Sequence, residues 1–256
     1  MTTTYDFGNG PVPAHRHKNS DGSEGGWVAD SAKIGFCVFV GDYARIGDYA
    51  RIGARASIVS DARIGNGARI GNDASIGARA SIGDGASIGD GASIGNDARI
   101  GARASIGDGA SIGDGASIVS DARIGDYARI GDYARIGDYA RIGNGARIGN
   151  GARIGDGASI GDDARIGDDA RIGNDARIVH GSHDESPAQA IIGRFVAAAS
   201  SREMIIIGCQ WHTLAHWLEN FDDITAGHGV TEWEMKMVRA FLKMCDEVLP
   251  RKGGDE

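Results

Sequence analysis

Residues 122–142 read ARIGDYARIGDYARIGDYARI and repeat one six-residue unit without interruption. The same register extends in both directions, from Val28 to His183, as 26 consecutive hexapeptides with no insertion or deletion. Ile or Val occupies the first position of every unit, Ala the fifth position of 24 units and Gly the second position of 22 units. An internal repeat this regular decides the fold, because every unit must adopt the same local structure.

A six-residue period matches neither the 3.6-residue repeat of an α-helix nor the two-residue alternation of a long strand. Ala at position five and Ile at position one of the next unit are two residues apart, so in a short strand both side chains point to one face. The Arg or Ser between them points to the other face. The Gly-Asp-x segment that follows is typical of a turn. Each hexapeptide therefore predicts one short strand and one corner.

Three such units close a triangular coil of 18 residues, so the 156 repeat residues predict about 8.7 coils. The narrow interior suits Ile and Ala, which agrees with a chain that is 41% hydrophobic but only 6% aromatic. We expect the isoleucines at position one to form the core. One row of them, with members 18 residues apart, consists of Ile46, Ile64, Ile82, Ile100, Ile118, Ile136, Ile154 and Ile172.

The pattern Ile-Gly-x-x-Ala-x resembles the hexapeptide repeat of left-handed parallel β-helix proteins. The left-handed sense is implied by this resemblance alone, since ordinary parallel crossovers are right-handed. The expected fold class is mainly β: a left-handed parallel β-helix, a triangular solenoid of about 8–9 coils, with a small C-terminal α/β module. We divide the chain into an N-terminal cap (1–27), the solenoid (28–183) and a C-terminal strand plus two-helix module (184–256) for capping and assembly.

Many proteins with this repeat are acyltransferases. The resemblance implies that such enzymes carry a loop extruded from the coils and a histidine that acts as general base. Here no loop interrupts the coils, and no histidine occurs from Val28 to Val179. His180 and His183 end the last unit, where we interpret them as part of a cap. The γ-class carbonic anhydrases share the repeat, but their three-histidine zinc site has no counterpart in these coils.

The charge distribution predicts a solvated surface of mixed sign. The net charge is −8, which disfavours a dedicated nucleic-acid-binding protein. Within the repeat, 18 Lys and Arg residues stand against 20 Asp residues. A row of serines on one face is continued by Arg129, Arg147 and Arg165, because these residues also lie 18 apart. These three arginines are a candidate surface patch.

The cysteines indicate a reducing compartment, because three scattered residues make no disulfide framework. Cys209, His212 and His216 have a spacing that suits metal ligands, and so do His15 and His17. Neither group is a complete site, so we predict no metal and no cofactor. The sequence shows no signal peptide and no apolar run long enough to span a membrane. We expect a protein of the bacterial cytoplasm or of a virion.

Residues 184–256 lose the repeat. Glu203–Cys209 predicts a strand, and Thr213–Phe221 and Thr231–Leu249 predict helices, the second of which begins with the capping-box residues Thr231 and Glu234. The apolar side chains of this segment are candidates for a self-association interface. They are Trp211, Trp217, Phe221, Trp233, Met237, Phe241 and Met244.

Both ends resemble phage and prophage accessory proteins with hexapeptide repeats. The resemblance rests on GNGPVPAHRH at 8–17, GGWVAD at 25–30 and the IGC, HTL and WL motifs within 207–218. It implies a non-enzymatic, phage-type solenoid that serves as a rigid scaffold or protein-interaction surface. We expect homo-oligomers through residues 184–256, a host or virion protein as partner, and no membrane or nucleic acid.

Two other functions remain open from the sequence. One is a phage inhibitor that binds a host defence protein or a nucleotide signal. The other is a hexapeptide-repeat acyltransferase that uses His180 or His183.

Overall fold

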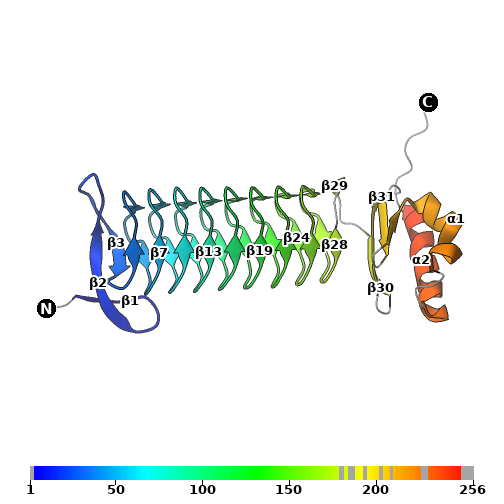
Figure 1. Ribbon diagram of the computed structural model, residues 1–256, viewed down its shortest axis with the longest axis horizontal. Helices are drawn as coiled ribbons and strands as arrows, with labels where there is room; N and C mark the ends of the chain where they lie inside the picture. The colour runs from blue at the N-terminus through cyan, green and yellow to red at the C-terminus, as the bar shows by residue number, and fades with distance from the viewer. Residues whose placement is uncertain are drawn as a thin grey trace, which may run out of the picture.

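The computed structural model describes residues 3–178, 182–183, 188–192, 195–201, 204–207, 210–225 and 230–248. Figure 1 shows N-terminal hairpins at one end, a long prism of stacked coils, and a small module of strands and helices at the other end. The prism is a parallel β-solenoid of about eight turns, which confirms the expected fold class.

The prism has three faces, each a sheet of short parallel strands. Face 1 continues the N-terminal hairpins and consists of β1 (Thr4–Asp6), β2 (Pro11–Lys18), β3 (Glu24–Ala29), β6 (Arg45–Ile46), β9 (Arg63–Ile64), β12 (Ser81–Ile82), β15 (Arg99–Ile100), β18 (Ser117–Ile118), β21 (Arg135–Ile136), β24 (Arg153–Ile154) and β27 (Arg171–Ile172). β1 and β2 are the antiparallel strands of this face.

The other two faces contain nine strands each. Face 2 consists of β4 (Lys33–Ile34), β7 (Arg51–Ile52), β10 (Arg69–Ile70), β13 (Ser87–Ile88), β16 (Ser105–Ile106), β19 (Arg123–Ile124), β22 (Arg141–Ile142), β25 (Ser159–Ile160) and β28 (Arg177–Ile178). Face 3 consists of β5 (Phe39–Val40), β8 (Ser57–Ile58), β11 (Ser75–Ile76), β14 (Ser93–Ile94), β17 (Ser111–Ile112), β20 (Arg129–Ile130), β23 (Arg147–Ile148), β26 (Arg165–Ile166) and β29 (Ser182–His183).

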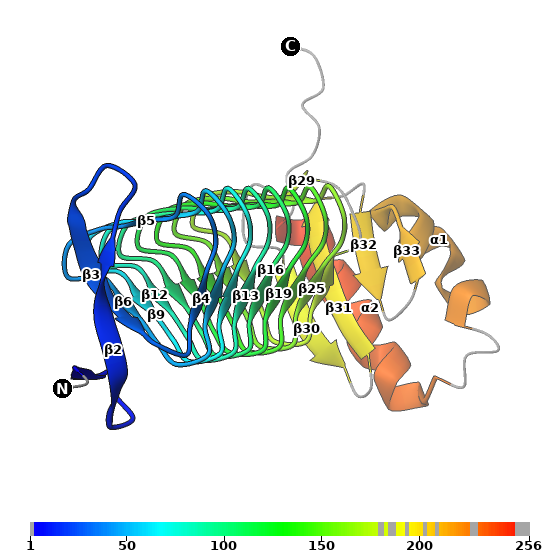
Figure 2. The same cartoon turned by 60° about the vertical axis from the view of Figure 1, so that its left-hand side comes forward.

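The register of the coils follows the predicted 18-residue period. Ser75 pairs with Ser57 on one side and Ser93 on the other, and Ile76 pairs with Ile58 and Ile94 in the same way. Identical positions therefore stack in straight rows, about 4.8 Å apart along the prism. Figure 2 shows the coils stacked behind β2 and β3.

The interior of the prism is filled by Ile and Ala. The row from Ile46 to Ile172 lies in the core, where each of its eight side chains is at most 3% exposed. The position-five alanines between the isoleucines are buried as well. Burial of an aliphatic side chain of this size contributes about 2 kcal/mol before chain entropy is counted, so the rows stabilise the coils together.

The corners require an unusual backbone conformation. The residue at position four has a positive φ in every corner from Cys37 to Asp175, as at Asp121 (60°) and Tyr127 (57°). At position two the coils approach each other closely. A Cβ added to Gly107 would lie 2.5 Å from the backbone nitrogen of Asp126 in the next coil. This contact explains why Gly is frequent at position two.

Carboxylates at position three tie neighbouring corners together. The backbone N–H of Asp90 donates to Asp108 Oδ1 at 2.8 Å, and the N–H of Asp108 donates to Asp126 Oδ1 at 3.0 Å. Asn72 donates to Asp90 in the same ladder at 2.7 Å. Many of the acidic residues in the repeat therefore have a structural role in the corners.

The N-terminal segment covers the first coil. Asn19 is 6% exposed, and its side-chain amide bonds both backbone groups of Val40, the N–H at 2.8 Å and the carbonyl at 3.1 Å. β5 is the end strand of face 3 and has a neighbouring strand on one side only. The Asn19 amide makes the hydrogen bonds that a strand on the other side would make. Tyr5 stacks on Trp27 with ring centroids 5.0 Å apart. These contacts fix the hairpins on the end of the prism.

The C-terminal module contains a four-stranded antiparallel sheet and two helices (Figure 1). Its elements are β30 (Ala188–Ile192), β31 (Phe195–Ser201), β32 (Met204–Ile207), β33 (Gln210–His212), α1 (Leu214–Thr225) and α2 (Glu232–Val248). The predicted strand and both helices are present, and three further strands occur that the sequence did not predict. The capping box of α2 forms as predicted: the Thr231 N–H donates to Glu234 Oε2 at 2.8 Å, and the Glu234 N–H donates to Thr231 Oγ1 at 3.2 Å.

The module uses most of its described apolar side chains for its own core. Trp217, Phe221 and Phe241 are at most 5% exposed and pack in one cluster with Ile205 and Leu242. Their assignment to an intermolecular interface is therefore wrong, because burial inside the module leaves them no surface to offer.

Two predicted interface residues of α2 do lie at the surface. Met237 and Met244 are each 40% exposed. The side chains of Trp211 and Trp233 lie outside the described residues. In the described part of the chain, neither helix has the length and apolar character required to cross a membrane.

The Ile and Ala core predicts how much stability is lost when one isoleucine side chain is shortened. Ile112→Ala should lower the free energy of unfolding by about 2–4 kcal/mol, because the rigid coils cannot collapse around the cavity. Ser111→Ala, one residue earlier on the exposed side of the same strand, is the matched control and should change it by less than about 0.5 kcal/mol. Denaturant titrations followed by circular dichroism measure both. Equal effects of the two substitutions would contradict the inward orientation of Ile112.

Candidate functional site

Several of the histidines and the cysteine predicted as site residues cannot be placed. His180 and Cys209 lie outside the described residues. The backbone of His183 pairs with Ile166 as the last strand of face 3, and its side chain is not described. The rings of His212 and His216 stack with centroids 4.4 Å apart. Within the described ranges, no three His, Cys, Asp or Glu side chains are grouped in a way that would hold a metal ion.

A different histidine is paired with a carboxylate. His15 Nδ1 lies 2.7 Å from Asp30 Oδ1 at the surface, where the two side chains are 54% and 46% exposed. His15 belongs to β2 and sits opposite Val28 of β3, and Asp30 follows the end of β3. Antiparallel pairing of these strands therefore places the two side chains together. When Nδ1 donates to the carboxylate, the Nε2 lone pair is free to accept a proton.

His17, the other histidine of this strand, has a different partner. Its Nε2 lies 3.3 Å from the carbonyl oxygen of Val38. Because His15 is held by Asp30 and His17 contacts the first coil, the sequence-based pairing of these two histidines as metal ligands has no support in this geometry.

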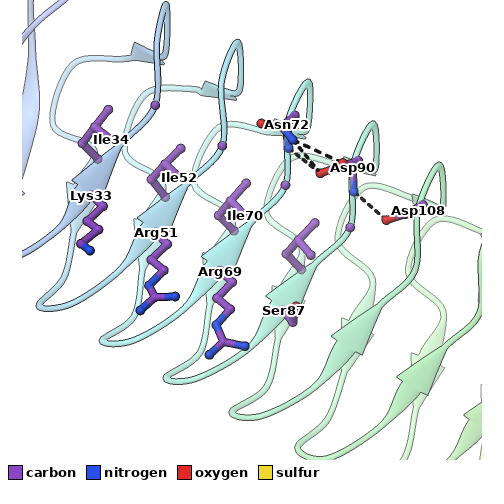
Figure 3. A pocket seen from close by; sticks show the side chains of 15 residues that line it. Lys33, Ile34, Arg51, Ile52, Arg69, Ile70, Asn72, Ser87, Asp90 and Asp108 are labelled. Carbon is purple, nitrogen blue, oxygen red and sulfur yellow. Dashed lines mark hydrogen bonds between the residues drawn. The ribbon is translucent and has the colours of Figure 1, made fainter.

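A cationic groove runs along face 2. Its first cation, Lys33, follows Asp30 by three residues, so the Cα atoms of the two residues lie within about 10 Å of each other. Figure 3 shows Lys33, Arg51 and Arg69 projecting in the same direction from three successive strands, with Ser87 next in the row. The groove has a volume of about 520 Å³.

The corner beside the groove is polar. Asn72, Asp90 and Asp108 form its edge and are joined by the hydrogen bonds drawn in Figure 3. Each carboxylate uses one oxygen for a backbone N–H of the previous coil. Three cations spaced about 4.8 Å apart repel one another, and an anionic ligand relieves that repulsion. The groove is therefore suited to a ligand with several negative charges.

Other arginines of the coils are already neutralised. Arg55 binds Asp73 through two hydrogen bonds of 2.7 and 2.6 Å at one corner. Arg79 with Asp97, and Arg103 with Asp121, repeat this arrangement at the other two corners. The hydrogen bonds from each arginine lower the pKa of its carboxylate partner. These corner pairs are structural and contribute little at an exposed position.

The predicted patch of Arg129, Arg147 and Arg165 forms a continuous row on face 3, because β20, β23 and β26 pair in register. The row continues the serine row of the same face, as the sequence predicted. It lies in the coils nearer the C-terminal module, far from His15. It is therefore no part of the candidate site formed by His15, Asp30 and the face 2 groove.

Sequence reasoning missed the pairing of His15 with Asp30. Asp30 occupies position three of the first hexapeptide, where an acidic residue is expected for structural reasons. The repeat gives no indication that a hairpin strand folds back beside this corner. The available signal was that His15 belongs to a β-prone run whose antiparallel partner ends just before Asp30.

Comparison with protein families matches five overlapping segments, which together span residues 43–150, to the model described as bacterial transferase hexapeptide (six repeats). These 108 residues are less than half of the chain. The match and the solenoid together support a left-handed β-helix of hexapeptide repeats. No curated protein matches the chain.

The structure is similar to UDP-N-acetylglucosamine acyltransferases. The enzyme from Francisella novicida has 21% identity and a TM-score of 0.46, covering 89% of this chain and 81% of that chain. The enzyme from Moraxella catarrhalis has 17% identity and a TM-score of 0.41, covering 86% and 92%. The Arabidopsis enzyme has 18% identity and a TM-score of 0.43, covering 83% and 78%. At these identities and TM-scores the similarity concerns the fold alone.

The expectation of a non-enzymatic protein is wrong. The family model that matches the coils is that of bacterial transferases, so the repeat itself points to an enzyme. The sequence-based argument relied on the absence of histidines from the coils, and it placed His15 in a cap over the first coil or, less favoured, in a metal site. A general base supplied by the N-terminal hairpin was not considered.

The two stacked histidines predict a pH dependence of the C-terminal module. Burial, and to a smaller extent the nearby His216, lower the pKa of His212 below its usual value near 6.5. The unfolded chain therefore takes up this proton more readily than the folded one. The stability that results is present above pH 6.5 and is lost as the pH falls below that value.

Thermal unfolding at pH 7.5 and pH 5.5, followed by tryptophan fluorescence, measures this effect. Trp217 is a suitable reporter, because it is buried and its Nε1 donates to the Ile205 carbonyl at 2.9 Å. His212→Gln should reduce the decrease in melting temperature between the two pH values. An unchanged decrease in this variant would show that other groups cause it.

Proposed function

We propose that the protein is a hexapeptide-repeat acyltransferase that uses His15 as general base and takes its acyl group from a phosphate-bearing thioester such as acyl-coenzyme A. Two observations carry the proposal: the His15–Asp30 pair, and the cationic groove of face 2, whose first residue, Lys33, follows Asp30 by three positions in the chain. The match of the coils to a transferase model supports the same class of reaction.

His15 has the features of a general base. Asp30 fixes the ring through Nδ1 at 2.7 Å, which selects the tautomer with a free Nε2. The ring is about half exposed, so an acceptor hydroxyl or amine can approach it. An imidazole that receives a proton is stabilised by the adjacent carboxylate. A histidine oriented by a third group in this way is a recurring arrangement in acyl transfer.

The groove provides the donor site. Lys33, Arg51 and Arg69 present three positive charges in a row, and coenzyme A carries a diphosphate and a further phosphate monoester. The first strand of face 2 begins three residues after Asp30. In this proposal the phosphates lie along the row of cations, and the thioester arm extends from Lys33 toward His15.

The chemical step transfers the acyl group from the thioester to the acceptor. His15 Nε2 removes the proton of the acceptor hydroxyl or amine as its oxygen or nitrogen attacks the thioester carbonyl. The acyl–sulfur bond breaks, and a new ester or amide bond forms. The proton passes from His15 to the departing thiolate, so free thiol and acylated acceptor are the products. Base catalysis of this kind contributes about 10²- to 10⁴-fold to the rate.

The remaining expectations from the sequence stay predictions. They are the phage origin, a host or virion partner, and self-association through residues 184–256. For self-association, the large apolar side chains described at the surface of the helices are Leu218 (49% exposed), Met237 and Met244. We propose these three as the contacts between copies.

The proposal predicts the effect of removing the base. His15→Asn should lower kcat by at least 100-fold, because the asparagine side chain cannot accept the acceptor's proton at neutral pH. Asp30→Asn should also lower kcat, because the carboxylate no longer orients the ring. Release of free thiol from acetyl-coenzyme A with a panel of amine and hydroxyl acceptors measures the rates. His17→Gln, two residues away on the same strand, is the matched control and should keep the activity.

Two results would overturn the assignment. One is wild-type protein that releases no thiol above the uncatalysed rate with any acceptor or acyl chain length in the panel. The other is an active protein whose His15→Asn variant retains its rate, which would place the base elsewhere.

The donor groove predicts a binding defect that is separate from the chemical step. Arg51→Gln combined with Arg69→Gln should raise KM for acyl-coenzyme A at least tenfold and leave kcat within about twofold, because the lost contacts are made equally before and during the reaction. Arg141→Gln lies on the same face outside the groove and is the control. A double variant with normal KM and normal coenzyme A binding by calorimetry would contradict the donor site.

A further inference from the structure

We propose a second anion site, on face 1, that takes a phosphate group of a small molecule above Ser81. A groove of about 520 Å³ lies on this face and is lined by Arg63, Ser81, Arg99 and Ser117, among others. It is separate from the groove of face 2 and shares no lining residue with it. The site goes beyond the proposed acyl transfer and does not depend on it.

The order of side chains along face 1 creates the groove. Ser81 pairs with Arg63 on one side and Arg99 on the other, and Ser117 follows Arg99 in the same row. Each serine is half-buried, whereas the arginines beside it are exposed. A short side chain between two long ones leaves a gap whose floor is a hydroxyl and whose walls are guanidinium groups.

The gap has the size of one tetrahedral oxyanion. Arg63 and Arg99 lie two strand spacings apart, about 10 Å along the sheet. Charge-assisted hydrogen bonds from guanidinium to oxyanion are about 2.8 Å long, so both side chains reach an ion centred over Ser81. The Ser81 hydroxyl donates a third hydrogen bond from below. Two guanidinium forks and one hydroxyl match the several oxygens of a phosphate monoester better than the two oxygens of a carboxylate.

The charges around the gap favour an anion. Within residues 3–178, neither Arg63 nor Arg99 forms an ion pair. Asp97 is the acidic residue in the lining, and its carboxylate is bound by Arg79 through two hydrogen bonds of 2.7 Å. Val119 closes the other edge with an apolar side chain that is 37% exposed. Arg99 also lowers the pKa of Asp97 through its charge, but the hydrogen bond from Arg79 is the larger cause. Neither face arginine lies at ion-pair distance from a carboxylate within residues 3–178, so both guanidinium groups are available to a ligand.

The same face contains an internal comparison. Arg135, Arg153 and Arg171 continue the row without a serine between them. The groove of face 1 does not extend over these three arginines. On this face it coincides with the part of the row in which Ser81 and Ser117 alternate with Arg63 and Arg99.

Calorimetric titration with inorganic phosphate tests the site. The background is the full chain carrying Arg51→Gln and Arg69→Gln, so that the groove of face 2 does not contribute. Arg63→Gln and Arg99→Gln should each weaken phosphate binding at least fivefold. Arg153→Gln, on the same face outside the gap, is the matched control and should leave binding within twofold.

Ser81→Arg distinguishes two explanations of binding, a gap above Ser81 and diffuse attraction to the positive surface, because they predict opposite outcomes. The repeat accepts arginine at this position in neighbouring coils, so the variant should fold, which its circular dichroism and melting temperature check. If the gap binds phosphate, filling it should abolish binding although a positive charge is added. Equal or tighter binding by Ser81→Arg would overturn the proposal and leave only diffuse surface attraction.

The ligand class is tested with further anions on the same background. Glycerol 3-phosphate and a nucleoside monophosphate should bind at least as tightly as inorganic phosphate, and their ratio shows which kind of phosphorylated molecule the groove prefers. Acetate should bind at least tenfold more weakly. Acetate binding as tight as phosphate binding would contradict a tetrahedral oxyanion site.

Discussion

The close approach of successive coils at position two is the constraint on which the prism depends. A Cβ at Gly107 would come within 2.5 Å of the next coil, so a side chain there requires the backbone to move. With glycine in place, the coils stack at the spacing of paired strands, and Ile and Ala fill the interior without gaps. The corner carboxylates then reach the backbone N–H groups of the previous coil.

Rigid stacking also determines how a binding surface can arise on this fold. The outward side chains stand in fixed rows, so the order of Arg and Ser along a row sets both charge and shape. Three consecutive cations line the groove of face 2, and alternating Arg and Ser line the gap on face 1. The chemistry that the coils lack is supplied by the hairpin, because β2 carries the histidine that pairs with the first corner.

The sequence predicted the solenoid well because each hexapeptide repeats the same local reasons for its structure. The row of Ile46 lies in the core and the coil contains 18 residues, as the period required. The C-terminal helices followed from apolar periodicity and the Thr231–Glu234 capping box. The fate of their apolar residues did not follow, because periodicity shows that Trp217 faces a partner but not whether the partner is a strand of the same module or another chain.

The candidate site was beyond the sequence for a related reason. The pairing of His15 with Asp30 depends on the fold of a hairpin that does not share the repeat, and the two residues are 15 positions apart. Only the antiparallel register of β2 and β3 brings them together. Similarly, the sequence alone does not distinguish Ser81 from the other outward-facing residues. Its significance appears once Arg63 and Arg99 are known to flank it.

The length of a coil has an evolutionary consequence. Gain or loss of three hexapeptides adds or removes one complete turn, and every downstream row keeps its face. Gain or loss of a single hexapeptide moves each downstream residue to the next face of the triangle. Such an event preserves the core, since Ile and Ala occupy the same positions in all units, but it scrambles the surface. Duplication of one unit therefore changes the stability of the fold little but rearranges the side chains that recognise a ligand. This architecture can thus generate new surfaces while its stability is kept.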